Sequence, residues 1–145
     1  MQLGQALPKS SVILKSQSCF PGGNAAGPAA YGLNGDALQR LLDTTGLPLF
    51  TDDYARGIVP DGHPNVFGFF ERGLNAAARM LPQADLVVLL GRKQDFTISY
   101  LRPPAVAADA KIIQVVPDAD QLALNRGVDV GIVGDVTTVV GQLAD

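Results

Sequence analysis

The stretch that decides the fold is residues 84–135, which contain ADLVVLLGRKQDF (84–96), KIIQVVPDADQLALNR (111–126) and VDVGIVGD (128–135). Each segment contains an apolar run, and a glycine, an acidic residue or a basic residue lies where that run ends. Continuous apolar runs are typical of strands whose two faces are both covered in a parallel sheet. The stretch therefore predicts three successive strands whose ends form one edge of a sheet.

The composition indicates a globular protein and excludes several classes of partner. The net charge of -3 provides no basic surface for nucleic acid or an anionic membrane. No apolar run approaches the roughly 20 residues that a membrane-spanning helix needs. The single cysteine, Cys19, cannot form an internal disulfide, so we expect a cytoplasmic protein.

The N-terminal third is predicted to hold one strand and one unusual loop. Leu3, Ala6 and Leu7 have helical spacing that ends at Pro8, so we expect Met1 to lie inside a longer parent chain. Residues 11–14 (SVIL) predict the first strand. The glycine- and proline-rich loop that follows either contacts a ligand or packs on a neighbouring domain.

The middle of the chain predicts two helices and a strand. Asp36 is expected to open a helix by accepting backbone N–H groups, and Gly46 to end it. Residues 47–51 predict the second strand, which a long loop follows. Apolar residues then recur at helical spacing over 67–81, until Pro82 stops the run.

The last third predicts two more helices, each opened by an aspartate. Asp118 is expected to cap a helix that runs to about Asn125, and Asp135 one that runs to Leu143. Strands and helices thus alternate, which predicts the α/β class. We expect a doubly wound, mostly parallel sheet of five or six strands with helices on both faces, similar to the Rossmann fold.

In such a sheet, ligands collect beyond the carboxyl ends of the strands. Gly91 follows VVLL at such an end, and Arg92 and Lys93 come next. A glycine lets a ligand approach the backbone, and an arginine binds phosphate with paired N–H donors. The alternative is a turn glycine followed by two solvated cations. On the first interpretation, Arg92 is dispensable for folding and essential for nucleotide affinity.

Asp118 and Asp135 have two interpretations, because a carboxylate at a strand-to-helix transition either binds ribose hydroxyls or caps the helix. The sequence contains neither the glycine fingerprint of dinucleotide folds nor a phosphate-binding P-loop. Cys19 and His63 lie in loops without a third group to orient them, and no cluster of metal ligands is present. We therefore predict no catalytic residue and no metal ligand.

A family resemblance covers residues 38–143. TGLPLFTDDYARGIVPDGHPNVFG (45–68) and the three segments quoted above, in this order, resemble the central domain of thiamine-diphosphate-dependent enzymes of the acetolactate synthase type. Oxalyl-CoA decarboxylase, 2-hydroxyacyl-CoA lyase and benzaldehyde lyase share that domain. The resemblance implies that residues 1–145 are one central domain, a six-stranded parallel sheet between pyrimidine- and pyrophosphate-binding domains of a homo-oligomeric parent enzyme.

The resemblance also implies where cofactors bind. Thiamine diphosphate and magnesium belong to the flanking domains, while some central domains hold FAD or the ADP part of coenzyme A. Gly91 and Arg92 fall on the family's G-A-R segment if one residue is missing. Asp118 falls on the second aspartate of V-D-I-D-P, and Gly134 with Asp135 on the terminal G-D.

Two departures weaken the nucleotide site. Val116 replaces the first aspartate of V-D-I-D-P, and the long loop after the first strand replaces the usual G-x-G. We therefore expect a largely scaffolding domain with a vestigial nucleotide crevice, from a decarboxylase or carboligase that is a lyase or a transferase. The alternatives are a stand-alone nucleotide-binding module and a structural domain that docks on a partner.

Overall fold

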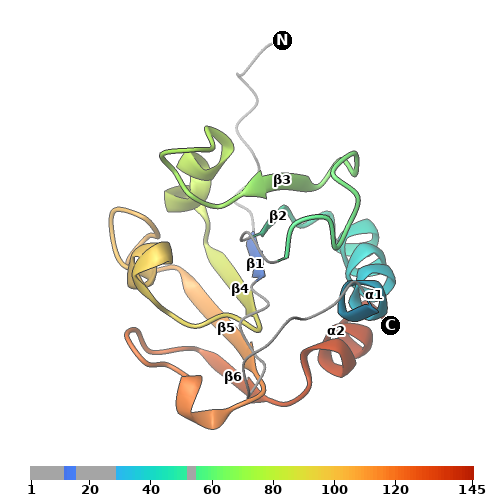
Figure 1. The fold of residues 1–145 in the computed structure, drawn as a ribbon. Coiled ribbons are helices and arrows are strands. Elements are labelled where there is room, and N and C mark those ends of the chain that lie inside the picture. The colour runs from blue at the N-terminus through green and yellow to red at the C-terminus, as the bar shows by residue number, and fades with distance from the viewer. Residues whose placement is uncertain (1–11, 16–28, 52–54) are drawn as a thin grey trace.

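The computed structural model describes residues 12–15, 29–51 and 55–145 (Figure 1). Its centre is one sheet of six parallel strands in the order β3-β2-β1-β4-β5-β6. This order is that of dinucleotide-binding folds, and it confirms the predicted α/β class. The strands are β1 (Val12–Lys15), β2 (Leu49–Thr51), β3 (Val66–Phe69), β4 (Leu86–Leu90), β5 (Lys111–Val116) and β6 (Val130–Val133).

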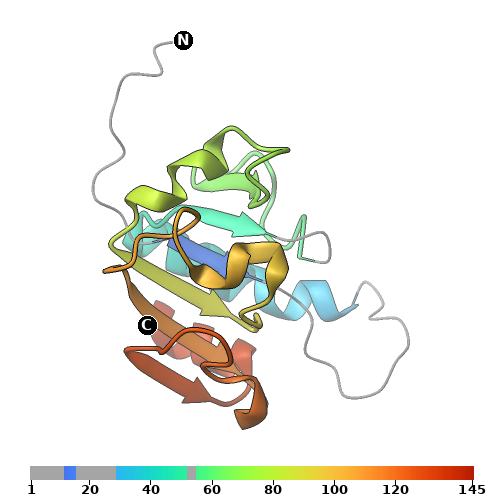
Figure 2. The same ribbon diagram turned by 90° about the vertical axis from the view of Figure 1, so that its left-hand side faces the viewer.

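Helices of two different kinds cover the two faces of the sheet (Figures 1 and 2). The helices α1 (Ala29–Thr45) and α2 (Val136–Ala144) lie side by side on one face. The 3-10 helices η1 (Ala77–Gln83) and η2 (Phe96–Leu101) cover the other. A third, η3 (Ala119–Gln121), follows β5. The sheet therefore has a thick α-helical cover on one side and a thinner one on the other.

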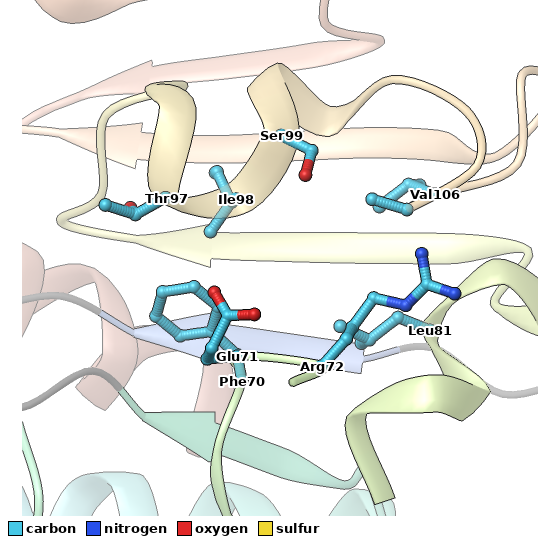
Figure 3. A pocket seen from close by; sticks show the side chains of 9 residues that line it. Phe70, Glu71, Arg72, Leu81, Thr97, Ile98, Ser99 and Val106 are labelled. Carbon is cyan, nitrogen blue, oxygen red and sulfur yellow. The ribbon is translucent and has the colours of Figure 1, made fainter. Parts of the chain in front are cut away.

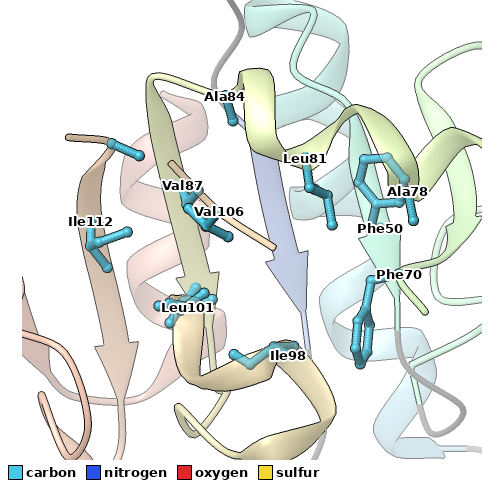
Figure 4. Packing of buried hydrophobic residues seen from close by; sticks show 12 residues of the cluster. Phe50, Phe70, Ala78, Leu81, Ala84, Val87, Ile98, Leu101, Val106 and Ile112 are labelled. Atoms are coloured by element: carbon cyan, nitrogen blue, oxygen red, sulfur yellow. The ribbon is translucent and has the colours of Figure 1, made fainter. Parts of the chain in front are cut away.

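Alternate residues of the central strands enter two separate cores. Val87 and Leu89 of β4 pack with η1 and η2, as Figure 4 shows for Val87. Val88 and Leu90 pack under α1 and α2. Because both faces of β4 are buried, its residues do not alternate between apolar and polar. This explains the continuous apolar run of β4.

The predicted helix over residues 67–81 is wrong. This segment forms β3 and then, after a turn, η1. The side-chain amide of Asn75 donates to the carbonyls of Phe67 and Phe69, at 2.7 and 2.5 Å, and so holds the turn. Phe67 and Leu81 nevertheless reach the same core. The apolar spacing predicted the burial of Phe70 and Leu81 correctly, but Leu74 of the same pattern is 80% exposed, because the backbone here is not a helix.

Two further boundaries differ from the prediction. Helix α1 begins at Ala29, so Asp36 lies inside the helix and does not cap it. The helix expected from Asp118 is only the single turn η3, because the buried side chain of Gln114 bonds the backbone of residues 121 and 123 instead. The first strand and the helix after Asp135 are confirmed.

Several predicted features lie outside the described residues, namely the N-terminal helix tail, most of the loop after β1, and Cys19. Within the described ranges, no helix is long and apolar enough to cross a membrane.

Two helical glycines provide a matched test of the packing. A Cβ atom added at Gly35 in α1 would lie 2.6 Å from the carbonyl oxygen of Ile58, whereas one at Gly141 in α2 would have no neighbour within 4 Å. We expect Gly35→Ala to lower the free energy of unfolding by about 1–3 kcal/mol because of overpacking. Gly141→Ala should raise it by about 0.5–1 kcal/mol through helix propensity. Urea unfolding measures both, and equal effects would contradict the close approach at Gly35.

Candidate functional site

The end of β4 places Arg92 in the protein interior. Gly91 adopts a φ of 63°, which favours glycine, and its N–H donates to the carbonyl of Val115 at 2.8 Å. The Arg92 side chain is only 5% exposed. Its guanidinium lies 4.3 Å from the centre of the Phe70 ring, donates to the Thr97 hydroxyl, and is 3.5 Å from an Asp95 oxygen. The charge is thus compensated within the chain.

This burial changes what Arg92 is expected to do. A phosphate-binding role stays a prediction, but the expectation that Arg92 is dispensable for folding does not fit its contacts. The exposed cation at this strand end is Lys93, which the sequence assignment left out. If the family's G-A-R segment is aligned with residues 91–93 without a gap, its arginine falls on Lys93.

Asp118 lies one strand further, at the end of β5. Its carboxylate accepts the N–H of Asp120 at 3.0 Å and caps η3, as the capping interpretation predicts. The side chain is exposed to solvent. Since β4 and β5 are neighbours, Gly91 and Asp118 lie at the same edge of the sheet.

Gly134 and Asp135 stand at the end of β6, separated from β4 by β5. The Gly134 N–H donates to the carbonyl of Val116 at 2.9 Å. One Asp135 oxygen accepts the backbone N–H of Thr138 at 2.8 Å and its hydroxyl at 2.9 Å. These bonds lower the pKa of Asp135 below its usual value of 3.8. Asp135 therefore caps α2, also as predicted.

A buried pair of amides ties together the loops after β4 and β5, which the sequence analysis missed. Gln94 and Gln114 are both fully buried, and their side chains bond each other at 3.2 Å. Gln114 also donates to the carbonyl of Arg92 and accepts from the N–H of Ala123. Gln94 accepts the N–H of Arg126 at 2.6 Å. The sequence does carry one sign of this pair, because Gln114 is a polar residue inside the apolar run IIQVV.

A small pocket lies between residues 70–72 and η2 (Figure 3). Its space is about 40 Å³, enough for a few water molecules and far below the volume of a nucleotide site. Phe70 and Ile98 contribute apolar walls, and Glu71 and Arg72 line one side. The pocket shares Phe70 and Thr97 with the surroundings of Arg92, but it is too small to be the predicted nucleotide crevice.

The described residues contain no group of three or more histidine, cysteine, aspartate or glutamate side chains that could hold a metal ion. His63 has a structural place, since its Nε2 is 2.9 Å from an Asp43 oxygen and its Nδ1 accepts the N–H of Asn65. These bonds join the end of α1 to the segment before β3.

Comparison with known proteins identifies the domain. A family model described as "Thiamine pyrophosphate enzyme, central domain" matches residues 25–143. The chain belongs to this family. The match confirms the resemblance found in the sequence and agrees with the six-stranded parallel sheet.

The chain matches only a small part of the length of its curated relatives. Mouse 2-hydroxyacyl-CoA lyase 1 is 33% identical over 117 residues, which are 81% of this chain and 19% of that protein. Acetolactate synthase of Mycobacterium avium is 34% identical over 111 residues, 76% of this chain and 18% of that protein. The chain thus spans about a fifth of the length of these relatives.

A solved structure supports the fold alone. The thiamine diphosphate-dependent 4-hydroxybenzoylformate decarboxylase of Rhodococcus jostii matches 93% of this chain and 24% of its own, with a TM-score of 0.63 and 20% identity.

The burial of Arg92 generates a first prediction about the site. Arg92→Ala should lower the free energy of unfolding by about 2–4 kcal/mol, because it removes a buried, hydrogen-bonded cation from its place over Phe70. The adjacent Lys93→Ala should change it by less than about 0.5 kcal/mol, since Lys93 is exposed. Chemical denaturation of both variants measures the difference, and equal stabilities would show that Arg92 is not a structural residue.

The cap on α2 predicts a pH dependence. At neutral pH, Asp135→Ala should cost about 1 kcal/mol of stability, the usual loss for a removed N-cap. Because folding lowers the pKa of Asp135, its contribution is complete above the usual value of 3.8 and is lost as the pH falls through the folded-state pKa. Urea unfolding of both proteins across the acid range should show their stabilities converging. A constant difference would mean that the ionised carboxylate is not responsible.

Proposed function

We propose that this central domain serves mainly as a scaffold in a thiamine-diphosphate-dependent decarboxylase or carboligase, of the acetolactate synthase type. On this proposal residues 1–145 form one domain between a pyrimidine-binding and a pyrophosphate-binding domain. The parent enzyme is a cytoplasmic homo-oligomer, and it is a lyase or a transferase. Family membership and the one-fifth span of the relatives support this placement.

The observation that carries the scaffold proposal is the burial of Arg92. The side chain best suited to grip a phosphate is instead bound to Phe70, Thr97 and Asp95 of its own chain. The neighbouring loops are likewise held by Gln94 and Gln114 rather than by a ligand. An edge that is held by its own side chains suits a domain that positions other domains.

The described part of this domain contains no cluster of three or more side chains that could bind magnesium. In the parent enzyme the flanking domains would hold both thiamine diphosphate and magnesium. The cofactor stabilises a carbanion, and that chemistry is its own. We assign no catalytic residue and no metal ligand to this chain.

A second candidate function is nucleotide binding, which the strand order and the exposed Lys93 at the end of β4 favour. FAD or the ADP part of coenzyme A would then lie beyond Gly91. Besides Lys93, the contacts would come from the residues assigned by resemblance, namely Gly91, Arg92, Asp118, Gly134 and Asp135. Val116, in place of an aspartate, removes one ribose acceptor.

Calorimetric titration with ADP, FAD and coenzyme A separates the two functions. For a scaffold with a vestigial crevice, we expect no saturable binding in the micromolar range. Saturable binding to any of the three would instead establish the nucleotide module. In that case Lys93→Ala should abolish it, while Lys111→Ala should not, because Lys111 lies at the start of β5 and pairs with Asp129.

A further inference from the structure

An exposed turn in the segment between β2 and β3 contains an aspartate that a glycine follows. The N–H of His63 donates to the carbonyl of Pro60 at 2.9 Å, which closes a β-turn with Asp61 and Gly62 at its two central positions. The Asp61 side chain is 59% exposed, and Gly62 is exposed as well. Both central residues of the turn are therefore in contact with water.

The backbone nitrogen of Gly62 is available as a nucleophile. Within residues 12–15, 29–51 and 55–145 it has no hydrogen-bond partner. A Cβ atom added at Gly62 would have no neighbour within 4 Å, so packing does not hold this peptide unit in place. The carboxylate of Asp61 is also weakly held, because its ion-pair partner Arg56 lies 3.6 Å away and is 71% exposed. The nitrogen and the carboxyl carbon of the preceding residue are thus both free to approach each other.

We propose that the Asp61–Gly62 bond is a modification site at which aspartate isomerises to isoaspartate. The Gly62 nitrogen gives up its proton and bonds the Cγ atom of Asp61, while one carboxyl oxygen leaves as water, so a succinimide ring forms. Water then opens the ring at either carbonyl. Breaking the new N–Cγ bond restores aspartate, whereas breaking the original bond to the main-chain carbonyl carbon leaves the chain linked through Cγ. The product has the same atoms as the starting chain, and these steps need no oxidant, reductant or cofactor.

Other positions lack at least one of the conditions for this reaction. Asp61 is the only aspartate in the sequence that a glycine follows, and a glycine has no Cβ atom to crowd the attacking nitrogen. Asp118 and Asp135 also hold their carboxylates in caps. Asn34 precedes a glycine, but it lies inside α1, where backbone N–H groups bond carbonyls one turn earlier. The structure therefore favours Asp61 as the reactive residue.

Isomerisation changes the main chain at a point that connects α1 with β3. It places an additional carbon atom in the backbone between Pro60 and His63, the two residues whose hydrogen bond closes the turn. The His63 ring is 2.9 Å from an oxygen of Asp43 in α1, and it accepts the N–H of Asn65. We therefore expect the modified chain to lose part of this connection and to open locally more often.

This inference goes beyond the scaffold function and does not depend on it. Incubation of the folded 145-residue chain at neutral pH, in water enriched in a heavy oxygen isotope, tests it. Trypsin then releases residues 57–72, because it cleaves after Arg56 and Arg72. We expect isoaspartate at position 61 of this peptide, with heavy oxygen taken from the solvent. In the intact modified chain, the amide hydrogen of His63 should exchange faster than before.

Two substitutions should change the rate in opposite directions. Gly62→Ala should slow the reaction about tenfold, equal to about 1.4 kcal/mol of activation free energy, because its Cβ atom crowds the attacking nitrogen. This variant should remain folded, since Gly62 has no positive φ and the added atom meets no neighbour. Asp61→Asn should form the same product at least about tenfold faster, with ammonia released in place of water, because an uncharged amide accepts a nucleophile more readily than a carboxylate does.

Thermal unfolding verifies that each variant is folded, and the chain unfolded in guanidinium chloride provides the reference rate. Equal rates for the original chain and Gly62→Ala would overturn the proposal. A rate in the folded chain more than about a hundredfold below the reference would also overturn it, because the turn then protects the bond. Isoaspartate formed mainly at Asn34 would do the same, since α1 and not this turn is then the reactive part of the chain.

Discussion

The structure depends on one constraint, namely that both faces of the central strands of the six-stranded parallel sheet must be buried. Two α-helices cover one face, and the short helices η1 and η2 cover the other. The thinner side leaves a small pocket lined by Phe70 and Ile98, and Phe96 at the start of η2 is 74% exposed. The surface features of the domain therefore follow from how its sheet is covered.

Short helices also leave more backbone groups without helical partners, and polar side chains satisfy them instead. Gln114 replaces helical bonds in the loop after β5. Arg126 donates to the carbonyls of Leu101 and Ala107 through one nitrogen, and to those of Ala108 and Ala110 through the other. Charge-assisted bonds of this type are stronger than neutral ones. These bonds hold the segments around η2 and before β5 to the loop that contains Arg126.

This internal bonding connects the fold to the proposed role. A nucleotide-binding relative would use the ends of β4 and β5 to hold its ligand, but here Arg92 and the two buried glutamines bind the chain itself. Asp118 and Asp135 are engaged as caps of the elements that follow their strands. The domain keeps the strand order of a nucleotide fold, while Arg92, Asp118 and Asp135 at this edge each make contacts within the chain.

The sequence by itself determined the family, the parallel sheet and the elements with strong local signals, such as the apolar run of β4 and the capped helix after Asp135. These features depend on neighbouring residues, so periodicity and capping report them. Only the tertiary structure decided that residues 66–69 form a strand, because Asn75 and the rest of the sheet fix that segment. It also decided the fate of Arg92, whose aromatic partner Phe70 lies far away in the sequence. Burial against a residue that is distant in the sequence leaves no local pattern. The sequence therefore could not show that Arg92, the main candidate for binding phosphate, is buried.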